Sequence, residues 1–378
     1  MVDSDVRYLI PFCTTPRQRE IVEAVSESGG QRAAARKLGV DSKNVWRTIN
    51  ALKLKAESTD TSTLWKFEDE NGNKILQWVK AKGDKQKEQE ATRAAFEAMS
   101  MDIPRLPAIS EPVPPTEASL LNQYTITDYH LGMLSWGEET GEDWNLGISE
   151  DTLLKWMERA ISLSPPAKCG ILAQLGDFLH YDSLDPLTPA NKHILGTDSR
   201  IQKIIRSAVY LLRRMIDMMV MKHDTVIVFN LEGNHDPVLS AAIREFLPIL
   251  YENEPRVTVV NSPSVYQSYR WGNTGLYYHH GHKANIKNID RVFVANFKET
   301  FSNCEYNYGH MGHYHTDEIM ETALMRLERH RTLIAPDAYA SRGGYISMRD
   351  AKVITYHNVY GEVGRTVIPI KMINGDEP

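Results

Sequence analysis

The sequence predicts an α/β protein preceded by a small all-α region, and three observations support this. Between residues 124 and 315, short apolar runs alternate with longer amphipathic segments, the pattern of strands and helices in an α/β fold. Residues 16–56 contain only short helical patterns separated by glycines. The two regions are joined by an extended, proline-rich stretch that contains Pro104, Pro107, Pro112, Pro114 and Pro115.

The N-terminal region is expected to form three short helices. The first begins at Pro16, because proline is favourable at the first helical position. The second covers residues 31–38 and ends at Gly39, a residue that suits the left-handed C-cap of a helix. The third begins after Asp41 and Ser42, both of which are good N-cap residues. A short alanine-rich helix, a glycine turn and a capped helix are typical of a helix-turn-helix.

The connection to the α/β region is expected to contain a β-hairpin. Apolar runs at 64–67 and 74–79 flank Asn71-Gly72, a strong signal for a hairpin turn. Residues 84–99 are charged and favour a helix, and the prolines follow. The predicted organisation is a helix-turn-helix DNA-binding module over 1–58, a hairpin, charged helix and linker over 59–118, and a main α/β domain over 119–378.

The main domain is expected to contain short strands and amphipathic helices in alternation. Strands are predicted at 124–127, 170–175, 225–231, 276–279 and 305–308, and helices at 150–163, 199–221, 237–251 and 286–301. The helix at 199–221 has a clear apolar stripe that includes Ile204, Ala208 and Leu211. Residues 331–373 are rich in Val, Ile and Tyr and are expected to add further strands.

Composition predicts a globular protein of a reducing compartment. Hydrophobic residues make up 42% of the 378 residues and charged residues 24%. No apolar run is long enough to span a membrane, and the first 16 residues do not resemble a secretory signal. The three scattered cysteines argue against a disulfide framework and against zinc held by thiolates. We therefore expect a cytoplasmic protein with no membrane partner.

The charge of the chain is unevenly distributed. The net charge is −6, but residues 16–56 have a charge of +5, which leaves −11 on the remainder. A basic segment attached to an acidic body indicates a polyanionic partner for the basic segment.

Five polar clusters occur in the main domain, and each follows a predicted strand. They are Asp128-Tyr129-His130, Gly176-Asp177, Gly233-Asn234-His235-Asp236, His280-Gly281-His282 and Gly312-His313-Tyr314-His315. Strand ends at one edge of an α/β core converge on a crevice, so these side chains are expected to meet. Carboxylates, imidazoles and an amide oxygen are ligands that suit divalent metals at a two-metal site.

The order of these clusters (D-x-H, GD, GNHD, HGH, GHxH) resembles that of the calcineurin-like metallophosphoesterases over about residues 124–315. This resemblance implies a four-layer β-sandwich flanked by helices, and a catalytic domain over 119–378. It implies a hydrolase of phosphate esters that uses a hydroxide activated by two divalent ions. Mn²⁺ is the expected metal, with Fe, Zn²⁺ or Ni²⁺ as alternatives.

The resemblance also implies roles for individual residues. One metal is held by Asp128, His130 and His315, the other by Asn234, His280 and His313, and Asp177 bridges both. His235 protonates the leaving oxygen or stabilises its developing charge. Asp236 either orients His235 or caps the helix that begins at Pro237, and the sequence leaves both roles open.

Other histidines follow the same strands or lie near them. His180 and His193 belong to the long segment after Asp177, and together with Arg200 and His282 they are candidates for contact with the substrate. His279 is expected on the face of its strand opposite to His280. His223 and His330 lie in helical or charged surroundings and are expected to be solvated.

The N-terminal module suggests the partner of the enzyme. Ser42, Lys43, Asn44 and Arg47 are expected to project from the third helix toward base edges and phosphates. The joint architecture resembles phage-type metallophosphoesterases, which implies a phosphodiesterase or nuclease acting on DNA. The alternative for the module is a trihelical protein-contact domain. The alternatives for the whole chain are a phosphatase or small-nucleotide phosphodiesterase that the module only localises, and a non-catalytic DNA-binding regulator. The oligomeric state is open, with a homodimer among the options.

Overall fold

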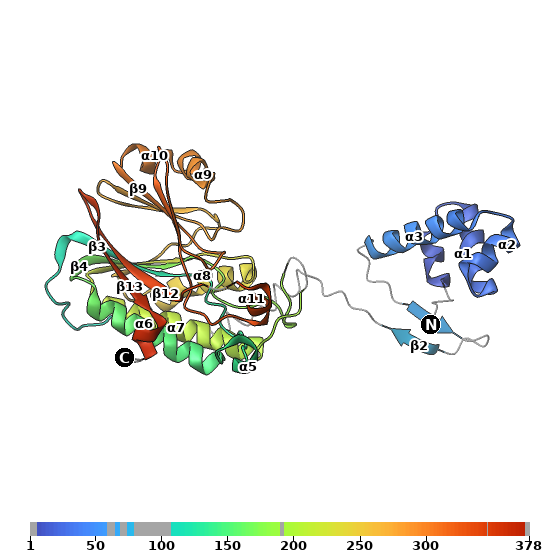
Figure 1. The fold of residues 1–378 in the computed structure, drawn as a ribbon, viewed down its shortest axis with the longest axis horizontal. Coiled ribbons are helices and arrows are strands. Elements are labelled where there is room, and N and C mark those ends of the chain that lie inside the picture. Colours follow the sequence, from blue (N-terminus) through green and yellow to red (C-terminus); the bar gives the residue numbers. More distant parts are fainter. Residues whose placement is uncertain are drawn as a thin grey trace. The chain divides into compact units, whose positions relative to one another are not determined.

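The computed structural model describes residues 6–58, 65–68, 74–78, 107–189, 193–345 and 347–374. The chain divides into two compact units, Met1–Glu88 and Gln89–Pro378 (Figure 1). No helix within the described ranges is both long and apolar enough to cross a membrane.

The described part of the N-terminal unit is a bundle of short helices. They are the 3₁₀ helix η1 (Arg7–Phe12) and the α-helices α1 (Pro16–Ser28), α2 (Gln31–Leu38) and α3 (Ser42–Ser58). Helix α1 begins with a capping box between Thr15 and Gln18, and Gly29 and Gly39 end α1 and α2 with φ of 68° and 63°. The starts of all three α-helices and the end of α2 at Gly39 agree with the prediction, whereas η1 was not predicted.

Two short strands follow the helices in the same unit. Strand β1 (Trp65–Glu68) pairs antiparallel with β2 (Lys74–Trp78), with Trp65 opposite Trp78. This pairing agrees with the predicted hairpin. The predicted turn at 69–73 and the charged segment at 84–99 lie outside the described residues.

The larger unit contains two β-sheets. The six-stranded sheet has the order β13-β12-β3-β4-β5-β6, with bounds β3 Glu117–Ile126, β4 Ala167–Gln174, β5 Thr225–Asn230, β6 Val257–Val259, β12 Asp350–His357 and β13 Gly361–Pro369. The five-stranded sheet has the order β10-β11-β9-β8-β7, with bounds β7 Gln267–Trp271, β8 Thr274–Tyr278, β9 Tyr306–Met311, β10 Glu318–Glu321 and β11 Arg326–Arg329. Strands β3, β4 and β5 are parallel to one another, as are β8 and β9.

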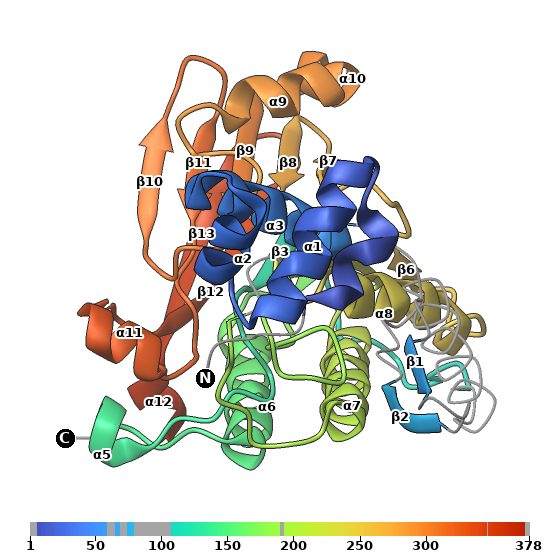
Figure 2. The same cartoon turned by 90° about the vertical axis from the view of Figure 1, so that its right-hand side faces the viewer.

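The two sheets pack face to face and helices cover their outer faces (Figures 1 and 2). The six-stranded sheet is covered by α6 (Leu146–Leu163), α7 (Ile201–Val220) and α8 (Pro237–Leu250), and the five-stranded sheet by α9 (Ile289–Asn296) and α10 (Lys298–Ser302). Strand β4 shows the alternation that this requires, because Ile171 faces the other sheet and Leu172 faces the helices. The predicted α/β fold with two sheets and flanking helices is thus confirmed.

The remaining helices of the described residues are short and lie in loops or near residue 374. They are α5 (Gly137–Thr140), α11 (Ala338–Gly343) and α12 (Ile370–Asn374). The predicted helix at 286–301 is two helices in the structure, because the backbone at Phe297 leaves the helical region with φ −123° and ψ 49°. The predicted strand at 305–308 continues to Met311, directly before the Gly312 cluster.

Two histidines lie in places that the sequence did not predict. His223 and His330 were expected to be solvated, but both are buried. The His223 ring lies 2.9 Å from the Tyr124 hydroxyl and 2.7 Å from the carbonyl of Ala167. His330 lies 2.9 Å from His310, between neighbouring strands. The expectation was wrong because the residues that bury these histidines are distant in sequence, and neighbouring charged residues do not indicate such contacts.

Candidate metal centre

The five polar clusters meet at one end of the paired sheets. Asp128 and His130 follow β3, Asp177 follows β4, and Asn234 lies in the loop between β5 and α8. His280 follows β8, and His313 and His315 follow β9. The donor atoms of these residues form two groups that share Asp128: Asp128, His130 and His315 in one, and Asp128, Asp177, His280 and His313 in the other. The convergence expected from strand ends is therefore present in the structure.

Asp177 lies between the two groups. Its Oδ2 is 3.2 Å from Nε2 of His280 and 3.9 Å from Nε2 of His130. Nε2 of His280 is also 3.3 Å from Oδ1 of Asn234. Across the site, Oδ1 of Asp128 is 3.3 Å from Nε2 of His315. One carboxylate oxygen of Asp177 thus faces imidazoles from both groups.

The backbone of the site is strained at the proposed ligands. Among the described residues, five that are not glycine have positive φ, and all five are predicted metal ligands: Asp128 (49°), His130 (45°), Asp177 (50°), His313 (75°) and His315 (55°). A non-glycine residue in this region costs about 1–3 kcal/mol and persists where the surrounding structure enforces it. Strain that falls on these five residues indicates that their placement serves the site and not the stability of the fold.

The glycines of three motifs are explained by the ligands of other motifs. A Cβ on Gly176 would lie 2.6 Å from Nδ1 of His280, and one on Gly233 would lie 1.9 Å from Oδ1 of Asp177. A Cβ on Gly312 would lie 1.9 Å from Oγ1 of Thr127. Contacts this short are not accessible to any side chain. Each glycine therefore allows one loop to approach the ligand of the next.

The residues present fit divalent cations. Oδ1 of Asp128 is buried and has no hydrogen-bond partner among the described residues, which is costly for a carboxylate oxygen. Two donors on a shared ion, each about 2.0–2.2 Å from it, lie about 3–3.6 Å apart. The separations of 3.2 and 3.3 Å between donors in this site are in that range. The donor set of carboxylate, imidazole and amide oxygen suits Mn²⁺, Fe or Zn²⁺.

The carboxylates of the site favour positive charge beside them. Burial lowers the pKa of His280, but the carboxylates of Asp177 and Asp128 outweigh it and raise this pKa to about 9. Burial lowers the pKa of His130 well below its usual range, and the neighbouring His235 adds to this. In the metal-free chain, the His280 imidazolium thus supplies positive charge that bound ions would supply in its place.

Hydrogen bonds hold both the backbone N–H and the ring of His235. Its N–H donates to Oδ1 of Asp177 (2.8 Å), and its Nδ1 lies 2.9 Å from the carbonyl of His180. A carbonyl only accepts hydrogen bonds, so Nδ1 holds a proton and Nε2 is the nitrogen left for chemistry. The ring centre of His235 is 4.6 Å from that of His130, which places it beside the proposed ligands.

Asp236 does not orient His235, contrary to one of the two expectations. Its carboxylate accepts hydrogen bonds from the N–H groups of Gly233 (2.9 Å) and Leu179 (3.0 Å) and from the Ser240 hydroxyl (2.8 Å). It occupies the N-cap position of α8, but its side chain does not bond the first turn. The N–H groups there bond to Asp182. Asp236 therefore ties the loop after β5 to the loop after β4.

Of the four candidate substrate residues, His180 and His282 lie beside proposed metal ligands, whereas His193 and Arg200 are exposed. His180 is buried, with Nδ1 3.4 Å from Nδ1 of His130. The ring of His282 is 5.3 Å from that of His280, and its buried Nδ1 has no partner in the described part of the chain. His193 and Arg200 are exposed, and neither belongs to a group of potential metal donors.

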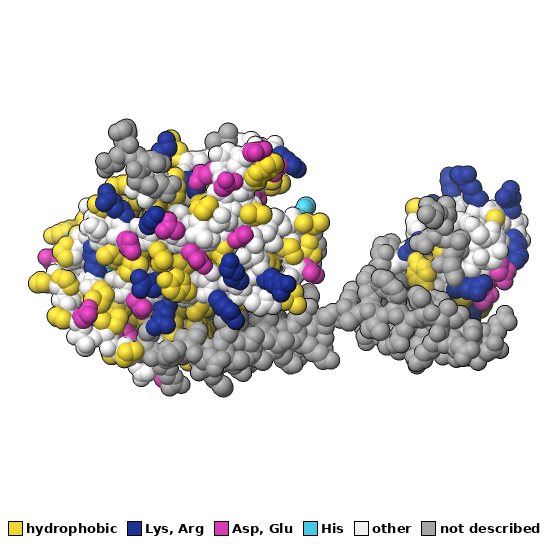
Figure 3. Space-filling view, turned by 90° about the horizontal axis from the view of Figure 1, so that it is seen from below, with side chains coloured by type: hydrophobic (Ala, Val, Ile, Leu, Met, Phe, Trp, Pro, Cys, Tyr) yellow, Lys and Arg dark blue, Asp and Glu magenta, His cyan; other side chains and the backbone are white. Residues whose placement is uncertain are grey.

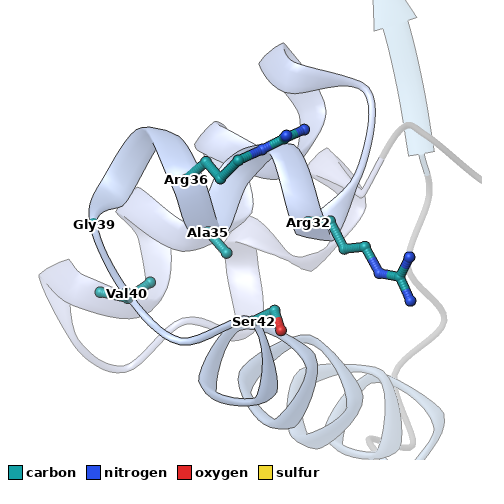
Figure 4. A pocket seen from close by; sticks show the side chains of 6 residues that line it. All are labelled: Arg32, Ala35, Arg36, Gly39, Val40 and Ser42. Carbon is teal, nitrogen blue, oxygen red and sulfur yellow. The ribbon is translucent and has the colours of Figure 1, made fainter.

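The candidate DNA contacts lie together on the N-terminal unit. Ser42, Lys43, Asn44 and Arg47 are all exposed on the first turns of α3. Next to them is a shallow pocket between α2 and the start of α3, lined by Arg32, Ala35, Arg36, Gly39, Val40 and Ser42 (Figure 4). The side chains of Arg32 and Arg36 extend from α2 at this pocket (Figure 4).

Two residues near the site had no place in the sequence prediction. The hydroxyl of Thr127 donates to Oδ2 of Asp128 (2.6 Å), and the hydroxyl of Thr332 donates to the carbonyl of Asp128 (2.7 Å). Thr127 directly precedes the first cluster, and this position is a signal that could have been used. Thr332 follows β11, and no signal in the sequence connects it to Asp128.

Comparison with known proteins shows remote likenesses of structure only. No family model matches the sequence, and no curated protein matches it. An archaeal phosphodiesterase is similar with a TM-score of 0.34 and 12% identity, over 65% of this chain and 99% of that chain. A conserved uncharacterized protein from Streptococcus pneumoniae TIGR4, described as a predicted phosphoesterase, gives 0.30 and 11% over 67% and 99%. Vps29 from Entamoeba histolytica in complex with Zn²⁺ gives 0.28 and 11% over 66% and 99%. All three TM-scores are below 0.5, so the function is inferred below from the chain's own residues.

Proposed function

We propose that this protein is a metal-dependent phosphoesterase of the calcineurin-like type, with two divalent ions at the candidate metal centre. The observation that supports this most directly is the backbone strain. Every described non-glycine residue with positive φ is one of the seven proposed ligands. A chain that only needed a stable fold would have no reason to hold two aspartates and three histidines in this conformation around a buried, unpartnered carboxylate oxygen.

In this proposal the ligands have the roles that the motif order implies. Asp128, His130 and His315 would hold one ion, Asn234, His280 and His313 would hold the other, and Asp177 would be a ligand of both. Such ions would supply Lewis-acid chemistry to the phosphoryl group and to an attacking water.

His235 is the proposed general acid. Because the His180 carbonyl holds the proton of Nδ1, the mobile proton is on Nε2, which faces away from that carbonyl. The hydrogen bond from the His235 N–H to Asp177 fixes the residue relative to the proposed bridging carboxylate. Nε2 can therefore protonate the leaving oxygen of a phosphate ester as the bond to phosphorus breaks.

An activity screen on metal-free and reconstituted protein tests this proposal. Substrates are bis-p-nitrophenyl phosphate, p-nitrophenyl phosphate, cyclic nucleotides and single- and double-stranded DNA, each with Mn²⁺, Fe²⁺, Zn²⁺ or Ni²⁺. We expect hydrolysis of at least one ester that a chelator abolishes and added metal restores. Protein that binds two ions per chain but hydrolyses none of these esters would contradict the proposed activity and favour a non-catalytic regulator.

We further propose that the substrate is a phosphodiester of DNA, because the basic residues of the N-terminal unit are divided into paired and unpaired sets. Arg17, Arg19 and Lys37 form ion pairs with Glu20, Glu23 and Glu27 at 2.6, 3.3 and 2.6 Å. In contrast, Arg32, Arg36, Lys43 and Arg47 are exposed and make no ion pair with any described residue.

The unpaired set lies on α2 and the start of α3, where the candidate DNA contacts also lie. Lys and Arg side chains gather on this unit, whereas on the visible face of the larger unit both signs are interspersed (Figure 3). Unpaired cations on a short helix and the helix after it are the electrostatic pattern expected for contact with phosphates.

The substrate assignment is tested on the full chain. Replacing Arg32, Arg36, Lys43 and Arg47 by Glu should abolish DNA cleavage and leave hydrolysis of bis-p-nitrophenyl phosphate unchanged. If DNA cleavage never appears while a small nucleotide or phosphomonoester is hydrolysed, the module serves only for localisation.

A further inference from the structure

The carboxylate of Asp128 has two oxygens in very different surroundings. Oδ2 accepts hydrogen bonds from the Thr127 hydroxyl (2.6 Å) and from the N–H of His313 (2.8 Å). Oδ1 is buried, accepts none, and lies 3.3 Å from Nε2 of His315. Two strong donors on one oxygen fix the rotation of the carboxylate, so Oδ1 alone is directed at the proposed ions.

The peptide of Asp128 is held from both sides as well. Its N–H donates to the carbonyl of Gly176 (3.0 Å), and its carbonyl accepts from the Thr332 hydroxyl (2.7 Å). Asp128 needs this support because its φ of 49° is unfavourable for a residue with a Cβ. Thr332 is buried and lies after β11, a strand that contributes no metal ligand in the proposed function.

Gly312 allows the end of β9 to pack against Thr127 and Asp128. A Cβ at this position would lie 1.9 Å from Oγ1 of Thr127 and 2.4 Å from Oδ2 of Asp128. The end of β9 therefore packs directly on the hydrogen bond between these two residues. The same packing brings the N–H of His313 to Oδ2, so the threonine, the aspartate and the β9 loop form one unit.

We propose that Thr127 and Thr332 are positioning residues for one metal site, because they hold Asp128 with Oδ1 toward the ion. This is the ion that His130 and His315 would also hold, so the inference rests on the proposed dinuclear centre. The carboxylate of Asp177 is also held by a backbone N–H, that of His235 on Oδ1, but no hydroxyl of the described residues donates to it. The two metal sites should therefore respond differently to the loss of Thr127.

Titration of Mn²⁺ into metal-free, full-length protein tests this inference, with calorimetry for affinity and metal analysis for the number of ions. Groups that orient a metal ligand typically affect metal affinity about 10–100-fold. Oδ1 of Asp128 is 3.3 Å from Nε2 of His315 but 3.9 Å from Nε2 of His280 in the other group. We therefore expect Thr127→Val to weaken binding of the ion at His130 and His315 by about this factor, and to weaken binding of the other ion clearly less. Thr332→Val should weaken binding of the same ion. Because Thr332 lies in another segment, this variant still tests the proposal if Thr127→Val does not fold.

Two control variants separate positioning from general damage to the core. Thr127→Ser keeps the hydroxyl and should bind both ions as the wild type does. Thr355→Val removes a buried hydroxyl that donates to Asn122 (2.8 Å) on the six-stranded sheet, and it should also bind both ions normally.

The possible failures of the test are distinguishable. The positioning role is wrong if the folded variants Thr127→Val and Thr332→Val bind both ions as tightly as the wild type. It is also wrong if their affinity for both ions falls equally. If the wild type itself binds fewer than two ions, the dinuclear centre is wrong and this inference ends with it.

Discussion

The backbone N–H of His235 donates a 2.8 Å hydrogen bond to Oδ1 of Asp177, so the proposed acid and the proposed bridging ligand are directly joined. With Oδ1 occupied, Oδ2 is the oxygen that faces His280 at 3.2 Å and His130 at 3.9 Å. A single oxygen between two imidazoles from different motifs can contact two cations at once. Asp177 should therefore matter more to metal binding than any residue that contacts one ion.

Replacement of this residue is the first prediction. Asp177→Asn keeps the shape of the side chain but removes its charge, so both ions should bind at least about 100-fold more weakly, beyond the usual effect of a supporting residue. Calorimetric titration with Mn²⁺ measures this. Asp185→Asn, at an exposed position of the segment that follows, is the matched control and should bind two ions normally. Loss of only one ion in Asp177→Asn would show that the carboxylate does not bridge.

The second prediction concerns the leaving group. His235→Ala should lower kcat by about 10²–10⁴-fold for an ester with an alkoxide leaving group, because proton transfer to that oxygen is lost. For a p-nitrophenyl ester the loss should be much smaller, because p-nitrophenolate leaves without a proton. Steady-state kinetics on both substrates gives the comparison. Equal losses on both would indicate that His235 positions the substrate or the metal and does not act as an acid.

The third prediction follows from the packing of motif glycines against ligands. Gly233→Ala would place a Cβ 1.9 Å from Oδ1 of Asp177, so this loop must move. Overpacking of this kind costs about 1–3 kcal/mol of stability, and it should also displace Asp177 and weaken metal binding. Gly364→Ala is the control, since its Cβ would lie 3.5 Å from Thr355, an ordinary contact. Thermal unfolding with and without Mn²⁺ distinguishes the two variants.

The proposed ligands were named from the sequence because their positions depend on a simple rule. Asp128, Asp177 and His280 lie two or three residues after the ends of apolar strands, and ends of parallel strands meet at one edge. The contacts that orient these ligands depend on the tertiary fold and were not predicted. The carbonyl of His180 bonds to the ring of His235, but every residue type has such a carbonyl, so the sequence does not indicate this contact. Thr332 bonds to Asp128 from 204 residues away in the sequence.

The same distinction explains the errors in the fold. Helical pattern alone predicted one helix over 286–301, but it could not show that the backbone turns at Phe297 between α9 and α10. His330 has charged neighbours in sequence, yet the adjacent strand β9 places His310 against it. Capping residues and strand ends are local signals, whereas burial of a polar side chain is decided by distant segments.

The fourth prediction uses a buried histidine away from the metal centre. Burial lowers the pKa of His223 to about 4, against about 6.5 in an unfolded chain. Between these values the unfolded state binds the extra proton, so the stabilisation is complete above about pH 6.5 and is lost as the pH falls toward 4. The full effect is about 3 kcal/mol.

His223→Gln should remove this pH dependence. In metal-free protein, the difference in unfolding free energy between wild type and His223→Gln should shrink as the pH is lowered from 7 to 4.5. Chemical denaturation at each pH provides the measurement. A difference that stays constant with pH would mean that His223 has the same pKa in the folded and unfolded protein.

The last prediction separates the two sets of basic residues in the N-terminal unit. Arg47 has no ion-pair partner among the described residues, whereas Arg17 is paired with Glu20 at 2.6 Å, so only Arg47 is free to replace a counterion on DNA. Arg47→Ala should weaken DNA binding and reduce the slope of log K against log salt concentration by about 1. Arg17→Ala should leave both quantities nearly unchanged, because the same contact to DNA would first require its ion pair to break. Fluorescence anisotropy over a series of salt concentrations measures affinity and slope together. Equal effects of the two substitutions would mean that the unit attracts DNA by its net charge alone, and no effect of either would favour a protein-contact role for the three helices.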